Sequence, residues 1–510
     1  MTVSQANSLI ERHGTLSSDG IGPLAAILKI VTDFLPGIPL WASPNLHYNV
    51  CAPVNVASAA IRCIADFFNI HNIHTGFAGQ CLAAERAVTS MMAEMAKIPR
   101  NQARGIFTFG GTGSNMYGIK LAINKVAPQA PKKGVPQYTN YFITTESHFS
   151  HETSADWLGI GTDQLHKIAC DFDRRSNVAD FISKAEYLLK QGQNIAGITL
   201  NGGTTYDHAI DDVKSFCQAR DYLVKKYSLT YSPHIHVDSV IGWVWLAFQG
   251  YDFVANSLQI KSSIIKILEE QYKRVSTISE ADSWGVDFHK ALGGCSVPSG
   301  MFISNHATDL MLLSKSRRGV ADTHQLGGDW ALDDPSDITL ETSRPAAPAL
   351  AALVALQTLG KSGIRRLVAN QVEMSIAFRE LIDATPFFLT GNPHSLGFCT
   401  LVVMPPINMI RPQSWRDFFA RACNDEHFRH RANSTVKDFY QFCATIQSDE
   451  TTPLGASFSR SFVKTDTEKP ISALKYYFVS PHIDRLAVIR ELRKMLRQAE
   501  QFYISRVPLR

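Results

Sequence analysis

Short apolar runs alternate with amphipathic segments along the middle of the chain. Runs rich in β-forming residues occur at 105–109, 141–144, 195–200, 234–237 and 300–304. Between them, apolar residues recur every three or four positions, which is the spacing of an amphipathic helix. Strands that alternate with helices in this way are typical of a mainly parallel sheet with helices on both faces. We therefore expect an α/β fold.

The pattern changes towards both ends of the chain. Residues 1–98 are predicted to form a mostly helical segment, with helices over 54–68 and 82–95. Residues 99–379 carry the alternating pattern and are expected to form the large domain. Residues 380–510 are predicted to form a smaller C-terminal α+β domain that ends in an amphipathic helix.

The composition is that of a soluble, globular chain without a strong electrostatic bias. Of the 510 residues, 45% are hydrophobic, enough to bury one large core and a smaller second one. The formal net charge is +4 and basic residues are interspersed with acidic ones, which argues against a nucleic-acid or membrane-surface partner. The nine cysteines are scattered and lack the spacing of a zinc site or of a disulfide framework. We expect no metal.

Two further features bear on location. Residues 1–7 lack a basic segment followed by an apolar stretch, so no signal peptide is predicted. The longest apolar stretch, residues 345–359, is expected to form a helix from about 346, but it contains two prolines and is too short to span a bilayer. We therefore expect a cytoplasmic protein without a membrane span.

The most informative residues stand where predicted strands end. Ligands on parallel sheets bind beyond the carboxyl ends of the strands. Asp238 ends the run His234-Ile235-His236-Val237, and Lys290 follows the apolar residues near Val286. An amine can condense with the aldehyde of pyridoxal phosphate, while a carboxylate can hold the pyridine nitrogen protonated. Taken singly, such residues are more often a turn former and a solvated loop pair.

A glycine-rich turn lies between the strand at 105–109 and the helix that follows. In Gly110-Gly111-Thr112-Gly113-Ser114, glycines allow the backbone to approach an anion, and the free N–H groups of a helix start can donate to it. The turn lacks the lysine of a Walker loop and the spacing of a dinucleotide fingerprint. A phosphate cradle and a simple tight turn are both compatible with it.

Two more polar turns follow predicted strands. His148, after the strand at 141–144, could stack as a neutral imidazole on a pyridine ring or be a hydrogen-bonded loop residue. Thr204 and Thr205, after the strand at 195–200, offer hydroxyl groups, and Asp211 is predicted to cap the next helix.

The motifs in this order resemble the group II pyridoxal-phosphate-dependent decarboxylases, the family of glutamate and aromatic amino acid decarboxylases. The motifs are Gly-Gly-Thr-Gly-Ser-Asn, Ser-His-Phe-Ser, Gly-Thr-Thr, His-Val-Asp and His-Lys, and the likeness extends from about residue 47 to 380. The resemblance implies fold type I, the fold of aspartate aminotransferase, in an obligate homodimer with sites at the subunit boundary. A helical segment like residues 20–98 usually embraces the partner subunit in this family.

The resemblance also implies roles for individual residues. Lys290 would be the aldimine lysine, and Asp238 would pair with the pyridinium nitrogen. His148 would stack on the ring and Thr205 would lie beneath the ring edge.

The phosphate would be bound in the glycine-rich turn. The resemblance assigns this role to Gly113 and Ser114, with assistance from His289.

Two family features are absent from the sequence. These decarboxylases carry a loop tyrosine that protonates the substrate carbanion, but residues 305–356 contain no tyrosine. His324 could substitute, although a surface-loop histidine is the more ordinary interpretation. The stretch at 475–480 lacks the arginine that fixes the side-chain carboxylate in glutamate decarboxylases, which disfavours glutamate as the substrate.

Other segments leave a different chemistry open. Thr342-Ser343-Arg344-Pro345 and Gly391-Asn392-Pro393 resemble sphingosine-phosphate lyase, which cleaves a carbon–carbon bond on the same fold. Trp243 and Trp245 are predicted to be core residues on a strand-like run rather than pocket residues. We expect decarboxylation of an L-amino acid to an amine. The alternatives are a carbon–carbon lyase and a degenerate cofactor-binding protein that acts through a partner.

Overall fold

The structure, a computed structural model, describes residues 3–51, 53–291, 294–315, 335–407, 409–445, 454–465 and 467–506. Within these residues, a seven-stranded sheet has the order β1-β7-β6-β5-β4-β2-β3. The strands are β1 (Arg104–Thr108), β2 (Thr139–Thr144), β3 (Leu165–Ile168), β4 (Asn194–Asn201), β5 (His234–Asp238), β6 (Ser283–Asp287) and β7 (Gly300–Ser304). Only β7 runs antiparallel to its neighbours β1 and β6, so the expected mainly parallel sheet is confirmed.

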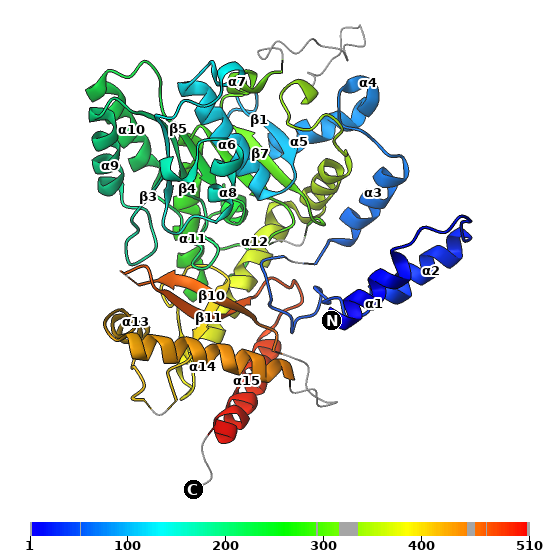
Figure 1. Ribbon diagram of the computed structural model, residues 1–510, viewed down its shortest axis with the longest axis vertical. Coiled ribbons are helices and arrows are strands. Elements are labelled where there is room, and N and C mark those ends of the chain that lie inside the picture. The colour runs from blue at the N-terminus through cyan, green and yellow to red at the C-terminus, as the bar shows by residue number, and fades with distance from the viewer. Residues whose placement is uncertain are drawn as a thin grey trace.

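Helices surround this sheet on both sides (Figure 1). The α-helices of this part are α4 (Thr75–Ala78), α5 (Leu82–Met95), α6 (Gly111–Val126), α7 (Ala130–Lys133), α8 (Ser150–Trp157), α9 (Val178–Lys190), α10 (Val213–Tyr227), α11 (Ser262–Val275) and α12 (Ala347–Asp383). The 3-10 segments are η1 (Gly79–Cys81), η2 (Thr162–Gln164), η3 (Gly242–Phe248), η4 (Ser276–Glu280), η5 (Ala307–Leu313) and η7 (Pro335–Asp337).

Helix α6 packs directly on the middle of the sheet, against β4, β5, β6 and β7. Ile119, Leu121 and Ile123 of this helix are fully buried. Gly118 permits the close approach to β5, because a Cβ atom at this position would lie 2.6 Å from the ring of His236. The start of α6 is thereby held at the carboxyl ends of β5 and β6, where the cavity described below lies.

A second, four-stranded antiparallel sheet of order β10-β11-β9-β8 forms the smaller C-terminal part (Figure 1). Its elements are β8 (Leu389–Thr390), β9 (Cys399–Val403), α13 (Trp415–Asn424), α14 (Glu426–Thr445), β10 (Ser457–Lys464), β11 (Pro470–Tyr477) and α15 (Arg485–Arg506). The expected α+β unit is therefore present. The predicted boundary at residue 380 falls within the last turn of α12.

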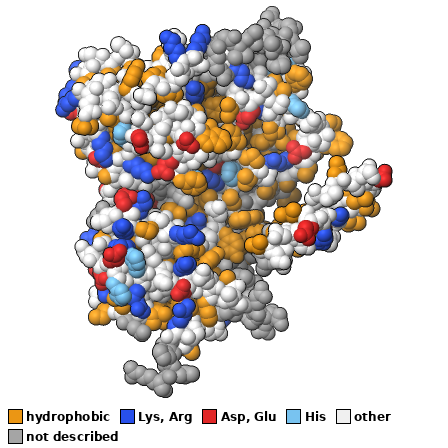
Figure 2. Space-filling view, in the orientation of Figure 1, with side chains coloured by type: hydrophobic (Ala, Val, Ile, Leu, Met, Phe, Trp, Pro, Cys, Tyr) orange, Lys and Arg blue, Asp and Glu red, His pale blue; other side chains and the backbone are white. Residues whose placement is uncertain are grey.

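The N-terminal elements are α1 (Val3–His13), α2 (Pro23–Phe34) and α3 (Val56–Phe67). The first two helices are joined by His13 Nε2, 2.7 Å from Asp33 Oδ2, and together form an arm that projects from the body (Figure 1). Neither α1 nor α2 contains a buried residue. Hydrophobic side chains gather on the face of the body beside the arm, and others lie along the arm among polar and charged ones (Figure 2).

Most predicted elements occur within a few residues of their expected bounds, with two informative differences. The helix expected over 346–359 continues as α12 to Asp383, with a break at Gly360, whose φ of +56° lies in the left-handed region. Trp243 and Trp245 are fully buried, which confirms the prediction that they are core residues. They lie on the 3-10 segment η3, however, so the expectation of a strand-like run was wrong.

By length and composition, α12 is the one helix among the described residues that could cross a membrane. It packs against α3, α5, η3 and α15, and 44% of its most apolar window is buried. A buried core helix of a globular protein meets the same criteria, so this helix is weak evidence for a membrane span.

We predict that Gly118→Ala lowers the free energy of unfolding by about 1–3 kcal/mol, because the new methyl group overlaps the His236 ring in a packed interface. Chemical denaturation of the full chain measures this change. Gly20→Ala is the matched control, since a Cβ atom there meets nothing within 4 Å. Equal stability of the two variants would contradict close α6–β5 packing.

Candidate active site

A cavity of about 210 Å³ lies beyond the carboxyl ends of β4, β5 and β6. Five of the residues predicted from the sequence line it, and they come from four separate loops and strand ends. These residues are His148, Thr205, Asp238, His289 and Lys290. The two others, Gly113 and Ser114, are not among the residues that line it.

Lys290 lies three residues beyond the end of β6. Its Nζ atom is 3.0 Å from Oδ2 of Asp287, and its backbone forms an isolated β-bridge with Cys51. Burial alone would lower the pKa of Lys290, but the carboxylates of Asp287 and Asp238 outweigh burial and raise it above its ordinary value. The amine is therefore an ammonium ion at neutral pH.

Asp238 ends β5 and is held by a donor from α6. The Asn115 amide nitrogen donates to Asp238 Oδ2 at 2.9 Å, and His151 Nε2 lies 3.8 Å from the same oxygen. Burial would raise the pKa of Asp238, but neighbouring donors and positive charge, including Lys290, lower it below its ordinary value. Burial lowers the pKa of His151 to about 4, so its ring is neutral at neutral pH. The carboxylate is then stabilised by Asn115, by Lys290 and by the Val240 backbone N–H, which donates to Asp238 Oδ1 at 3.4 Å.

Asn115 is itself fixed by a buried chain of hydrogen bonds. His236 Nε2 lies 3.2 Å from Asn115 Oδ1, and His236 Nδ1 lies 2.8 Å from Ser283 Oγ. Neighbouring strand β6 therefore orients the amide that holds Asp238.

His148 is a neutral imidazole in the loop that follows β2. Burial lowers its pKa, and its Nδ1 atom pairs with Ser150 Oγ at 2.9 Å. Thr205 is positioned from the smaller domain, because the Tyr477 hydroxyl donates to its backbone carbonyl. His289 is also neutral at neutral pH, since burial lowers its pKa, and its Nδ1 atom lies 3.3 Å from Ser299 Oγ.

The glycine-rich turn presents different residues to the cavity than the sequence suggested. Helix α6 begins at Gly111, after Gly110 with a φ of +111°, and it is Gly110, Gly111 and Thr112 that line the cavity. Ser114 lies two residues beyond Thr112 in the helix and turns its hydroxyl towards Gly285 of β6. Its oxygen is buried without a hydrogen-bond partner among the described residues. Phosphate binding by Gly113 and Ser114 stays a prediction.

The turn after β4 corrects the expected cap of α10. Asp212, not Asp211, caps this helix, because its side chain accepts from the Ser215 backbone N–H. Asp211 instead accepts from the backbone N–H groups of Asn201, at 2.6 Å, and Ser176, at 2.7 Å. It thereby holds the end of β4 beside the cavity.

Two acidic residues that the sequence analysis left without a role also line the cavity. Asp287 ends β6, and its position three residues before Lys290 is the signal that could have marked it. Glu146 lies two residues before His148 and 3.5 Å from Arg174, and burial raises its pKa to about 7. Glu146 can therefore gain or lose a proton near neutral pH.

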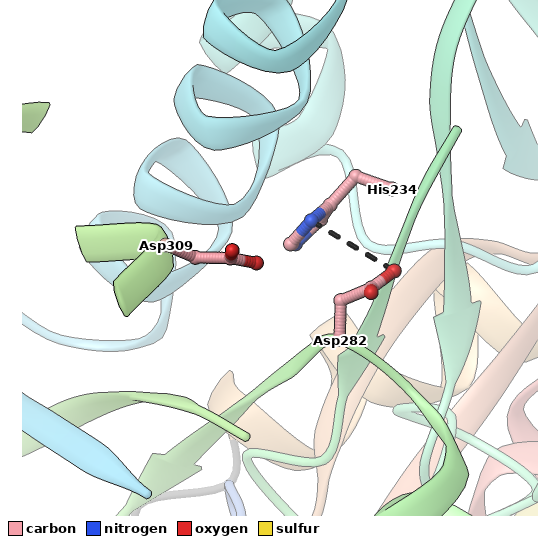
Figure 3. A group of neighbouring side chains, drawn as sticks. All are labelled: His234, Asp282 and Asp309. Atoms are coloured by element: carbon pink, nitrogen blue, oxygen red, sulfur yellow. Dashed lines mark ion pairs between the residues drawn. The ribbon is translucent and has the colours of Figure 1, made fainter. Parts of the chain in front are cut away.

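A separate group of titratable side chains lies at the opposite end of the strands. His234, Asp282 and Asp309 face one another there, with His234 Nδ1 3.9 Å from Asp282 Oδ2 (Figure 3). Lys125 Nζ lies 2.7 Å from Asp309, and Arg220 donates to Asp282 at 3.0 Å. Two cations thus already balance the two carboxylates, as in a structural ion-pair cluster.

The pyridoxal-dependent decarboxylase conserved domain matches residues 23–400, which is most of the chain. The chain belongs to the pyridoxal-dependent decarboxylase family. It is therefore a carboxy-lyase whose cofactor is pyridoxal phosphate.

Relatives of this decarboxylase share modest identity over most of its length. An L-2,4-diaminobutyrate decarboxylase of Rhizobium meliloti is 23% identical over 390 residues, covering 76% of this chain and 70% of the relative. An acidic amino acid decarboxylase of Xenopus tropicalis is 23% identical over 407 residues, covering 78% and 72%.

Solved structures support the fold. Mouse CSAD in its apo form has a TM-score of 0.76 at 16% identity and covers 98% of this chain and 92% of its own. Oryza sativa TDC with PLP and tryptamine has a TM-score of 0.75 at 13% identity, covering 97% and 92%. At these identities the likeness establishes fold type I alone, as the sequence motifs predicted.

The residues of the cavity fit the cofactor of this decarboxylase. Lys290 offers an amine for an aldehyde, and Asp238 is a carboxylate held ionised beside the same cavity. The first N–H groups of α6 have no partner within the helix and can donate to a phosphate. His324, the candidate proton donor, lies outside the described residues.

We predict that Asn115→Leu raises the pH at which the visible spectrum of the bound cofactor changes on acidification, because Asp238 then takes up a proton at higher pH. Without the amide donor, the pKa of Asp238 rises by about 1–2 units, the equivalent of a hydrogen bond to a charged group. The visible spectrum followed against pH measures the shift. Asn124→Leu is the control, since Asn124 lies on the same helix but donates to the Leu312 carbonyl. Superimposable titrations of Asn115→Leu and the wild type would contradict this role.

Proposed function

We propose that this decarboxylase removes the α-carboxylate of an L-amino acid as carbon dioxide and leaves the corresponding amine. We further propose that Lys290 is the residue that holds the cofactor covalently. The observation that carries the proposal is that Lys290 and Asp238, opposite in charge, line one cavity at the carboxyl ends of neighbouring parallel strands. Both are required of a protein that uses this cofactor.

When bound, pyridoxal phosphate supplies an aromatic ring that withdraws electrons from the substrate α-carbon. Asp238 would keep a proton on the ring nitrogen, because its own pKa is low and it stays ionised. His148, neutral and flat, would pack on the ring face, and Thr205 would lie beneath the ring edge. Lys290 would hold the cofactor through its amine nitrogen, and its Nζ atom would accept protons from the substrate amine.

Phosphate binding is proposed for the start of α6. Gly111 and Thr112, the first two residues of α6, line the cavity, where the helix dipole favours an anion. Gly113 would contribute the next N–H group of the same turn. The hydroxyl of Ser114 would contribute only if its side chain turned away from β6.

Carbon–carbon cleavage is the alternative reaction on the same scaffold. Arg344, in the segment that resembles the lyase, is buried, lies 3.3 Å from Glu85 and donates to the Phe107 carbonyl at 3.1 Å. This segment therefore has a structural explanation that requires no lyase chemistry. A screen of L-amino acids that follows carbon dioxide and aldehyde release in parallel decides between the two reactions.

We predict that Lys290→Ala abolishes both turnover and the visible absorbance of covalently held cofactor. Asp238→Ala should retain that absorbance but lose at least about a hundredfold in carbon dioxide release, since a buried charge partner of the ring is lost. Lys315→Ala is the control, a lysine outside the cavity. A Lys290→Ala spectrum like that of the wild type would overturn the assignment.

The degenerate alternative predicts a different pair of results. A cofactor-binding protein that acts only through a partner would show the visible absorbance but would release carbon dioxide from none of the amino acids.

We also propose that the protein is a homodimer in which the arm of α1 and α2 packs on the partner subunit. The apolar side chains of α2 are about half exposed, among them Ile27 at 59% and Val31 at 45%. A row of such side chains on a projecting arm is costly to leave in water. A second copy of the chain is the occupant expected from the family.

We predict that the double substitution Ile27→Asp and Val31→Asp shifts the protein to a monomer on dilution, because both side chains lie on one face of α2. Light scattering coupled to size exclusion measures the mass. Leu16→Asp is the control, because Leu16 is 98% exposed in the link between α1 and α2. A wild-type chain that is monomeric throughout would refute the dimer.

A further inference from the structure

Asp287 is a buried carboxylate that the proposed reaction does not use. Its residue is 1% exposed, and apart from the Lys290 ammonium neither carboxylate oxygen has a hydrogen-bond donor among the described residues. Its close polar neighbours are Lys290 Nζ at 3.0 Å and the neutral ring of His289, whose Nε2 lies 3.6 Å away. A buried carboxylate with so few donors depends on the Lys290 ammonium for its stability.

The same carboxylate lies at the start of α6. A Cβ atom on Gly111 would be 2.8 Å from Asp287 Oδ2, so only a glycine allows this approach. The end of β6 is fixed there, because the indole N–H of Trp243 donates to the Asp287 carbonyl at 3.1 Å. Asp287 therefore places an anion where the helix dipole favours one and where the cofactor phosphate is proposed to bind.

We propose that Asp287 is an internal counter-anion, a positioning residue that holds Lys290 as an ammonium ion in the cofactor-free protein and restrains its covalent capture of the cofactor. The inference rests on the proposed assignment of Lys290. Asp287 has two effects. Its carboxylate keeps Lys290 unreactive until the cofactor arrives, and the same carboxylate opposes entry of a second anion, the phosphate, at the start of α6.

Capture requires the neutral form of the lysine. The Lys290 ammonium first gives one proton to water or to Asp287. The amine nitrogen then forms a C=N bond to the aldehyde carbon, and the aldehyde oxygen leaves as water with the two remaining amine protons. No oxidant or reductant is needed.

The charged and titratable groups around Lys290 fix the direction in which the capture rate depends on pH. Asp287, Asp238 and the thiol of Cys51 face it and raise its pKa, whereas burial lowers it. The rings of His148 and His289 also face Lys290 but are neutral at pH 7. Asp287 is the closest of these groups. Removing its charge lowers the pKa of Lys290, so the neutral amine becomes more abundant at pH 7.

The test is Asp287→Asn in the full chain stripped of cofactor. Its rate of capture of pyridoxal, which lacks a phosphate, should rise at least about tenfold at pH 7, since one pKa unit changes the neutral fraction tenfold. The rate should also level off at a lower pH than in the wild type. Capture of pyridoxal phosphate should rise more than capture of pyridoxal, because repulsion of the phosphate is also removed. Visible absorbance measures all rates, and inorganic phosphate should compete more strongly in the variant.

The control is Asp282→Asn, which removes a buried carboxylate at the other end of β6. Asp282 pairs with Arg220 at 3.0 Å and Lys125 at 3.6 Å, far from the lysine, so its loss should leave both capture rates unchanged. Circular dichroism verifies folding, and Asp287→Ser provides a second variant should the asparagine not fold.

The outcomes separate this inference from the function on which it rests. If both Asp287 variants had the capture rates and the pH profile of the wild type, the counter-anion role of Asp287 would be overturned. Capture that persists in Lys290→Ala, or that is missing from the wild type, would instead overturn the assignment of Lys290. A gain in capture of pyridoxal without a greater gain for pyridoxal phosphate would overturn the proposed opposition to the phosphate.

Discussion

The site depends on the parallel pairing of β5 with β6, since this pairing places two strand ends side by side. His236 pairs with Ser283 and Val237 with Trp284, so both strands end at the same edge of the sheet. Asp238 is the last residue of β5 and Asp287 is the last residue of β6. Lys290 lies three residues after Asp287. Helix α6 then covers this edge because Gly118 permits it to lie against β5. Backbone register therefore brings together groups that are distant along the chain.

The charges at this edge are closely balanced. The carboxylates of Asp238 and Asp287 and one ammonium ion face a small cavity, and the start of α6 adds the partial positive charge of its free N–H groups. Glu146, whose pKa is raised to about 7, also lines this cavity. Asp238 is additionally held by Asn115, whereas Asp287 depends on Lys290. When the lysine becomes neutral, Asp238 therefore keeps the Asn115 donor, whereas Asp287 loses its nearest cation.

Much of this arrangement could be predicted from the sequence, because strand-forming runs mark where parallel strands end. Asp238 and Lys290 were identifiable for that reason. The orientation of Ser114 was not, because it depends on which residue begins α6, and each residue rotates the facing direction of a helix by about 100°. With Gly111 as the first residue, Thr112 faces the cavity and Ser114 faces β6. Motif spacing does not encode that start.

Asp282 and Asp287 show why residue type alone could not assign the second carboxylate. Both flank the same strand, both are buried, and they are separated by about 15 Å of extended chain. Asp282 meets Arg220, Lys125 and the Ile235 backbone N–H, so its charge is fully compensated within the fold. Asp287 meets Lys290, the lysine that is proposed to bind the cofactor covalently. Asp282 is therefore a structural residue, whereas the charge of Asp287 is compensated only while Lys290 is an ammonium ion.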